Sequence, residues 1–130
     1  MTTDVMPSRA PLRVLCLEDN PLIVLHLEQM IEDLGHVYAG ALESLVELKD
    51  RFGFVPVDCV LVDIDLADGR TGPEAAAWLR ERGIPSLFVT GQETIARDHR
   101  DVVVDLISKP VSPDALRSGL DQIAARSADA

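Results

Sequence analysis

Residues 60–69 read VLVDIDLADG, an apolar run that becomes acidic and ends in a glycine. The branched residues at 60–62 are typical of the end of a strand that is buried on both faces. Three aspartates then follow within six positions. Asp63 is the first residue beyond the apolar run, so we expect it to point into a pocket at the end of that strand. Asp68 precedes Gly69, and this pair is typical of a turn.

On both sides of this stretch, short apolar runs alternate with helical patterns. The predicted strands are 12–17, 36–41, 59–62, 86–89 and 102–107. Helices are predicted from Asn20 to Gly35, at 42–52, from Pro73 to Gly83, and from Ser112 onward. The segment 92–100 is short and polar, so its pattern does not favour a helix.

Five strand–helix units whose strands are apolar on both faces predict an α/β domain with a parallel sheet covered by helices on both sides. Right-handed crossovers then give a doubly wound five-stranded sheet, in which ligands bind beyond the carboxyl ends of the strands. We assign residues 11–125 to this domain. A flexible N-terminus at 1–10 and a short C-terminal tail at 126–130 are expected to flank it.

Composition restricts the function. A chain of 130 residues suits one domain, and its formal charge of −10 disfavours contact with nucleic acid or anionic lipid. No run has the length of a membrane span or of a signal peptide's apolar segment, so a cytoplasmic protein without membrane insertion is expected. Cys16 and Cys59 lie in apolar runs, which favours buried thiols over a disulfide.

The ends of the predicted strands carry the polar groups of interest. The first strand is followed by Glu18 and Asp19, the third by Asp63, the fourth by Thr90, and the fifth by Ser108 and then Lys109. Lys109 is one of only two lysines, in a chain whose other basic residues are arginine. Parallel strands bring these ends to one edge of the sheet, so the edge would gather three carboxylates, a hydroxyl and an ammonium group.

This set of groups suits phosphoryl chemistry. Clustered carboxylates resist ionising together unless a cation joins them, and a few oxygen ligands without thiolate or imidazole suit Mg²⁺. An aspartate facing the metal, with a lysine across the pocket, can attack a phosphoryl group. The metal and the compact ammonium would neutralise charge on the transferring oxygens.

Four motifs in this order, LCLEDNPL, VLVDIDLADGRTG, LFVTG and ISKPV, make residues 11–125 resemble the receiver domain of bacterial two-component response regulators, with its flavodoxin-like fold. The resemblance implies that Asp63 accepts a phosphoryl group from a phosphohistidine donor. It implies Mg²⁺ bound directly by Asp19 and Asp63, by Glu18 through water, and by the backbone carbonyl of Asp65. Thr90 and Lys109 would contact the phosphoryl oxygens, and the Lys109–Pro110 bond would be cis.

The same resemblance implies the partners: a sensor histidine kinase or histidine phosphotransfer protein as donor, and a downstream protein as target. Because no residues remain for an output domain, we expect a stand-alone receiver that signals by protein contact or phosphorelay, catalysing only its own phosphorylation and dephosphorylation. The sequence departs from the family at Leu106, where many receivers carry an aromatic switch residue, and in a longer loop after Asp65.

Two alternatives stay open. A pseudo-receiver would serve as an interaction module without phosphoryl turnover, and Leu106 leaves that interpretation open. A haloacid-dehalogenase-like phosphohydrolase shares the Asp-x-Asp motif after an apolar strand, as in VDIDL. In that family, however, the second acidic pair follows the lysine, whereas Glu18 and Asp19 precede Asp63 here. No His spacing predicts a zinc site.

Overall fold

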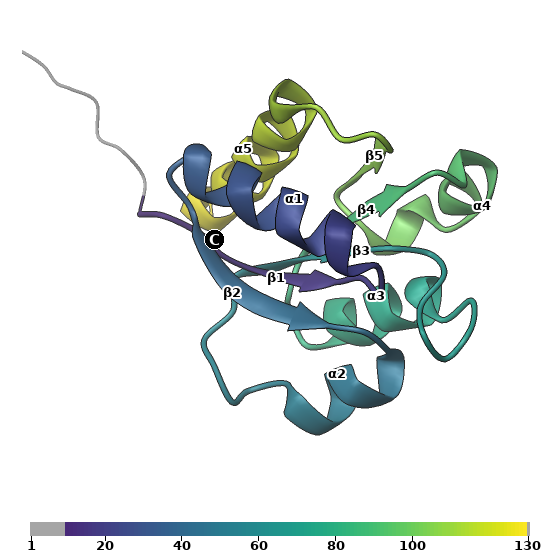
Figure 1. Cartoon of the computed structure of the whole chain (residues 1–130). Coiled ribbons are helices and arrows are strands. Elements are labelled where there is room, and N and C mark those ends of the chain that lie inside the picture. The colour runs from purple at the N-terminus through teal and green to yellow at the C-terminus, as the bar shows by residue number, and fades with distance from the viewer. Residues whose placement is uncertain (1–9, 130) are drawn as a thin grey trace, which may run out of the picture.

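The computed structural model describes residues 10–129, with side chains described as far as residue 126. Five strands form one parallel sheet in the order β2-β1-β3-β4-β5 (Figure 1). The strands are β1 (Arg13–Leu17), β2 (Val37–Leu42), β3 (Cys59–Val62), β4 (Ser86–Thr90) and β5 (Asp105–Ser108). The helices are α1 (Pro21–Asp33), α2 (Leu45–Arg51), α3 (Gly72–Glu81), α4 (Glu93–Asp98), the 3₁₀ helix η1 (Arg100–Val102) and α5 (Pro113–Asp129).

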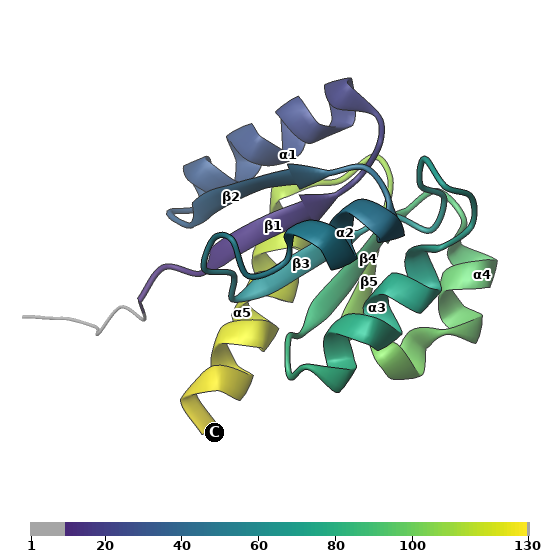
Figure 2. The ribbon, with the colours of Figure 1, turned by 90° about the horizontal axis from the view of Figure 1, so that it is seen from below.

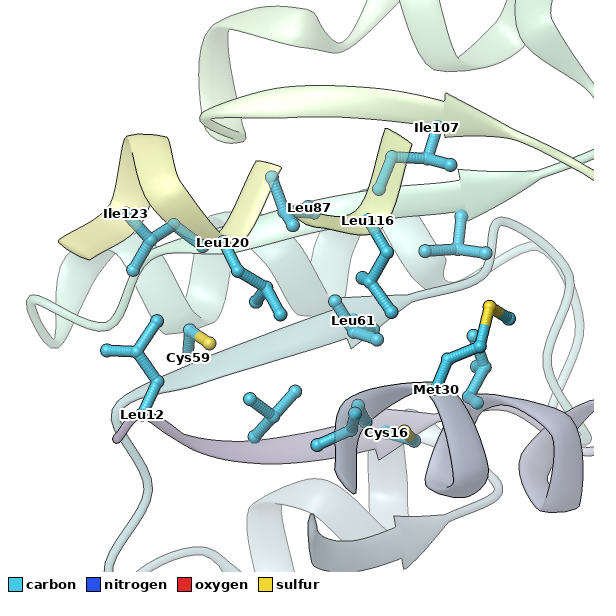
Figure 3. Close-up of a cluster of buried hydrophobic side chains, with 14 of the residues drawn as sticks. Leu12, Cys16, Met30, Cys59, Leu61, Leu87, Ile107, Leu116, Leu120 and Ile123 are labelled. Carbon is cyan, nitrogen blue, oxygen red and sulfur yellow. The ribbon is translucent and has the colours of Figure 1, made fainter. Parts of the chain in front are cut away.

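The helices form two layers, as the doubly wound fold requires. Figure 2 shows α2 and α3 in front of the sheet, with α1 and α5 on its other face. Each layer encloses its own apolar cluster. The cluster under α1 and α5 is shown in Figure 3, and its labelled members are Leu12, Cys16, Met30, Cys59, Leu61, Leu87, Ile107, Leu116, Leu120 and Ile123.

Apolar residues at helical spacing in the sequence predict one buried face on each helix, and the structure confirms this for α1 and α2. Leu27, Met30 and Ile31 of α1 are buried, as are Leu45 and Leu48 of α2. The spacing of apolar residues along the sequence predicts the buried face because each helix packs on the sheet through one stripe of side chains. None of the described helices combines the length and apolar character that a bilayer crossing needs.

Both cysteines are buried free thiols, as predicted. Burial raises the pKa of Cys16 and of Cys59 to about 12. These thiols therefore act as small apolar core residues, because the reactive thiolate is not formed near neutral pH.

One predicted absence of a helix and two predicted boundaries were wrong. A helix does form within 92–100, although α4 has only six residues. The last strand begins at Asp105 instead of 102, because Val102 closes η1 through its N–H bond to the carbonyl of His99. The second helix begins at Leu45 instead of 42, where Ser44 caps it by accepting the N–H of Glu47.

The flanking segments differ in what the structure describes. Helix α5 continues to Asp129 and so includes most of the stretch 126–130 that we predicted as a tail. Apart from Ala10, the predicted flexible N-terminus at 1–10 lies outside the described residues.

Candidate functional site

The carboxyl edge of the sheet brings the predicted site residues together. Strands β1, β3, β4 and β5 are neighbours in that order, so the residues that follow them lie side by side. Glu18 and Asp19 follow β1, Asp63 follows β3, and Thr90 is the last residue of β4. Lys109 follows β5, beside Thr90, whose carbonyl accepts the Lys109 backbone N–H at 3.0 Å.

Lys109 joins two of the carboxylates. Its Nζ donates to Glu18 Oε1 at 2.8 Å and to Asp63 Oδ2 at 2.9 Å, and its side chain is only 20% exposed. Burial alone would lower the pKa of Lys109, but the hydrogen bonds to Glu18 and Asp63 outweigh it and raise the pKa above the usual value. Lys109 is therefore a cation at neutral pH. The Lys109–Pro110 bond is cis, as expected.

Three carboxylates converge beside this lysine. Glu18, Asp19 and Asp63 each offer an oxygen, and these oxygens lie within 4.8 Å of one another. Glu18 is buried and Asp19 is exposed. Burial raises the pKa of Glu18, and its hydrogen bonds from Lys109 and from the Asn20 N–H offset only part of that effect. Oxygen ligands of this number and charge fit a hard divalent cation such as Mg²⁺.

Backbone contacts fix the position of Asp63. Its N–H donates to the carbonyl of Leu17, which ties the end of β3 to β1, and its Oδ1 accepts the N–H of Ile64 at 2.7 Å. Gly72 packs directly against this backbone. A Cβ added to Gly72 would lie 2.6 Å from Ile64 Cα and closer still to the carbonyl oxygen of Asp63. Helix α3 therefore begins this near the site only because residue 72 has no side chain.

Sequence reasoning missed the polar residues that surround Asp65 and Thr90. The Asp65 carboxylate accepts bonds from Arg70 Nε, at 2.9 Å, and from the Gln92 side-chain amide. The hydrogen bond from Arg70 lowers the pKa of Asp65. Thr90 is fully buried, and its Oγ1 accepts the backbone N–H of Gln92 at 3.0 Å. No periodicity marks Arg70 or Gln92, because both lie in loop segments.

Asp68 lies in a turn closed by Leu66 and Gly69, as predicted, and also has a second role. Its carboxylate accepts the N–H groups of Leu45 and Val46, both at 3.2 Å, at the start of α2. These are two of the backbone donors that a helix N-terminus leaves without an intrahelical partner. The loop after β3 therefore also caps a helix that precedes it in the chain.

The sheet order and the acidic cluster with its lysine define an α/β signalling domain of the receiver type. The chain belongs to the response regulator receiver domain family, because that family's model matches residues 14–121. Domains of this family are signalling modules and not conventional enzymes. The match favours our main interpretation over the phosphohydrolase alternative.

Curated relatives contain the same domain within longer proteins. The phyllosphere-induced regulator PhyR of Methylorubrum extorquens is 32% identical over 112 residues, which is 84% of this chain and 42% of that protein. The sensor protein GacS of Pseudomonas syringae pv. syringae is 33% identical over 116 residues, 82% of this chain and 13% of that protein. The chain thus spans less than half the length of these two relatives.

Solved structures agree with the fold. The receiver domain of PhyR from Erythrobacter litoralis has a TM-score of 0.76 and 30% identity, and the match covers 87% of this chain and 89% of that one. The anti-anti-sigma factor PhyR from Bartonella quintana has a TM-score of 0.79 and 27% identity, and the match covers 93% of this chain and 50% of that one.

Proposed function

We propose that this chain is a phosphoacceptor switch in which Asp63 receives a phosphoryl group from a phosphohistidine. The observation that carries the proposal is the contact of Lys109 Nζ with both Glu18 and Asp63, inside a cluster of three carboxylates. A merely structural ion pair needs one carboxylate. Additional acidic groups converging on the same point suit a site that binds both a cation and a phosphoryl group.

The transfer forms one bond and breaks one. An Asp63 carboxylate oxygen attacks phosphorus, the new P–O bond forms as the P–N bond of the phosphohistidine breaks, and the histidine nitrogen leaves with the electron pair. Asp63 is suited to this attack because Lys109 lies 2.9 Å from its Oδ2, and its 12% exposure leaves a donor a narrow approach. When water later attacks the phosphoryl group, the bond between Asp63 and phosphorus breaks and inorganic phosphate leaves.

Asp19 and Asp63 would hold Mg²⁺ directly, Glu18 through water, and Asp65 through its backbone carbonyl. When bound, the ion offsets the negative charge of the carboxylates and of the phosphoryl oxygens. Lys109 would move from its present contact with Asp63 to a phosphoryl oxygen while keeping its bond to Glu18. Thr90 would donate its hydroxyl proton to another phosphoryl oxygen.

The partners follow from the chemistry and from the relatives. We propose a sensor histidine kinase or a histidine phosphotransfer protein as donor and a downstream protein as target, in the cytoplasm. The structural relative from Bartonella quintana is described as an anti-anti-sigma factor, so a regulatory protein is a reasonable class of target. The pseudo-receiver alternative rests on Leu106, a half-buried leucine packed against the α2–α3 cluster where many receivers carry an aromatic residue.

Our first prediction concerns covalent phosphorylation. After incubation with phosphoramidate and Mg²⁺, intact mass should show one added phosphoryl group on the native chain and on Asp65→Asn, and none on Asp63→Asn. The reason is that Asp63 lies in direct contact with Lys109 inside the cluster of three carboxylates. Omitting Mg²⁺, or adding a chelator, should abolish the adduct.

The controls separate the alternatives. A native chain that neither forms an adduct nor consumes phosphoramidate would contradict the proposal and favour the pseudo-receiver. An adduct that persists in Asp63→Asn would assign the acceptor to another residue. Circular dichroism of each variant shows whether a missing adduct reflects loss of the fold.

A further inference from the structure

Three side chains form a closed ring beside Asp63 and Thr90. Arg70 Nε donates to Asp65 Oδ1 at 2.9 Å, Arg70 Nη2 donates to Gln92 Oε1 at 3.0 Å, and Gln92 Nε2 donates to Asp65 Oδ2. Each member therefore bonds both of the others. We refer to Asp65, Arg70 and Gln92 as the loop ring.

The loop ring joins two separate loops. Asp65 and Arg70 belong to the loop between β3 and α3, whereas Gln92 belongs to the connection between β4 and α4. Among residues 10–129, no backbone–backbone hydrogen bond runs between these two loops. The side chains of the ring are therefore the polar link that holds one loop against the other.

The ring is also connected to Thr90. The same Gln92 whose side chain is held by Arg70 donates its backbone N–H to Thr90 Oγ1 at 3.0 Å. Asp65 lies two residues beyond Asp63. Movement of Gln92 away from Arg70 would therefore disturb the hydrogen bond that Thr90 accepts, and it would release the side chain of Asp65 two residues from Asp63.

An exposed ion pair is usually a weak surface contact, and Arg70 and Asp65 are 56% and 49% exposed. Two observations distinguish this pair. The planar guanidinium uses two different nitrogens for acceptors on two different loops, a fixed geometry that the single nitrogen of a lysine does not have. The third member of the ring, in addition, bonds the buried hydroxyl of Thr90 through its backbone.

We propose that Arg70 is a positioning residue that fastens the β4–α4 loop to the β3–α3 loop, and so limits how often the site opens to water. This inference rests on the proposed phosphoacceptor function. With the loops fastened, a phosphoryl group on Asp63 is protected. With Arg70 removed, the loops separate more often, and both phosphorylation by a small donor and loss of the phosphoryl group become faster.

The test compares rates of phosphoryl loss in the full chain, followed by intact mass after phosphoramidate is removed. Arg70→Ala and Gln92→Ala should each lose the group about threefold to fivefold faster, the effect of one exposed ion pair and one hydrogen bond. The double variant should match the single variants, because either change opens the same ring. Arg70→Lys keeps the charge but lacks the planar guanidinium, so it should still lose the phosphoryl group faster than the native chain does.

Arg117→Ala is the matched control. Arg117 is 57% exposed and pairs with Asp114 at 3.0 Å, so it resembles Arg70 in exposure and partner but lies on α5. The rate of phosphoryl loss in Arg117→Ala should equal that of the native chain. Equal rates of phosphoryl loss in Arg70→Ala and in the native chain would overturn the inference. It would also be overturned if the effects of Arg70→Ala and Gln92→Ala on this rate multiplied in the double variant.

A second measurement does not depend on phosphorylation. Amide hydrogen exchange of the Gln92 backbone N–H, read by NMR on the unphosphorylated chain, should be slow in the native chain and in Arg117→Ala and faster in Arg70→Ala. If the native chain takes no phosphoryl group, the proposed function fails and this exchange rate alone decides whether Arg70 fastens the loop. Unchanged exchange in Arg70→Ala would overturn the inference.

Discussion

Lys109 illustrates what one residue contributes in this protein. It is one of two lysines, and its position after the fifth strand predicted a role at the sheet edge. The structure adds that a single ammonium group serves both Glu18 and Asp63. A buried carboxylate such as Glu18 is costly unless it is paired, so Lys109 also stabilises the fold around the site.

Ser86 gives a prediction about stability. It is buried in β4, and its Oγ has no hydrogen-bond partner among the described residues. Because an unpaired buried hydroxyl costs free energy, Ser86→Ala should raise the free energy of unfolding by about 1 kcal/mol. Urea denaturation with a chelator present measures this change.

Ser44→Ala is the opposing control for that experiment. The Ser44 hydroxyl accepts the Glu47 N–H at 3.0 Å and caps α2, so its removal should lower the free energy of unfolding by about 1 kcal/mol. A loss of stability in Ser86→Ala would show that the Ser86 hydroxyl has a partner and would contradict the prediction.

The helices differ in how far their boundaries depend on neighbouring residues in the chain. Helix α1 was predicted from Asn20, whose side chain accepts the Leu22 N–H, and from Pro21 at its first position. Helix α2 takes part of its cap from Asp68, which lies 23 positions beyond Leu45. A local pattern predicts a boundary only where the capping groups are also local.

Gly72 gives a prediction about the start of α3. A Cβ there would collide with the backbone of Asp63 and Ile64, which cannot rotate out of the way as a flexible side chain could. Gly72→Ala should therefore lower the free energy of unfolding by about 2 to 3 kcal/mol and reduce phosphorylation by shifting Asp63. Thermal or urea unfolding and intact mass measure the two effects.

Gly91→Ala is the control for that variant, since a Cβ at Gly91 meets no heavy atom within 4 Å and its φ is not in the left-handed region. Its stability should stay near that of the native chain. Equal stability of the two alanine variants would mean that α3 moves to accept the methyl group and that the close approach is not required.

Over the molecule as a whole, the formal charge of −10 coexists with a site that concentrates carboxylates around one lysine. Stability should therefore depend on pH and on cations. Mg²⁺ that binds the folded chain and not the unfolded chain would stabilise the fold, by linkage.

A more specific dependence on pH comes from His36, whose Nδ1 accepts the backbone N–H of Leu12 at 3.0 Å.

His36 should make the protein less stable in mild acid. Burial lowers the pKa of His36, against a smaller opposing effect of Asp121. The unfolded chain therefore binds a proton at His36 more readily than the folded chain does. The contribution of His36 to stability is fully present above the unfolded pKa of about 6.5, and it is lost as the pH decreases below that value towards the lowered folded pKa.

The measurement is urea denaturation between about pH 7.5 and pH 5, a range that spans the unfolded His pKa. It compares the native chain with His36→Asn, whose side chain can accept the same N–H without titrating. The fall in stability should be smaller in His36→Asn. His26 is exposed, so His26→Asn serves as the control and should follow the native curve. Parallel curves for the native chain and His36→Asn would contradict the assignment.

The sequence by itself determined the alternation of strands and helices, the inward stripes of α1 and α2, and the strand-end residues Asp63, Thr90 and Lys109. These follow from periodicity and from the rule that parallel strands share one carboxyl edge. The start of β5 did not follow, because the apolar run from Val102 to Val104 resembles a strand although β5 begins only at Asp105.

Only the tertiary structure decided which groups touch. Lys109 bonds Glu18 across 91 positions of the chain, Gln92 meets Asp65 across 27, and Asp68 caps Leu45 across 23. Patterns along a sequence report the neighbours within one helix or strand, whereas these contacts depend on how separate loops approach at the sheet edge. The strand-end residues of the site could therefore be predicted, but the network of bonds between them could not.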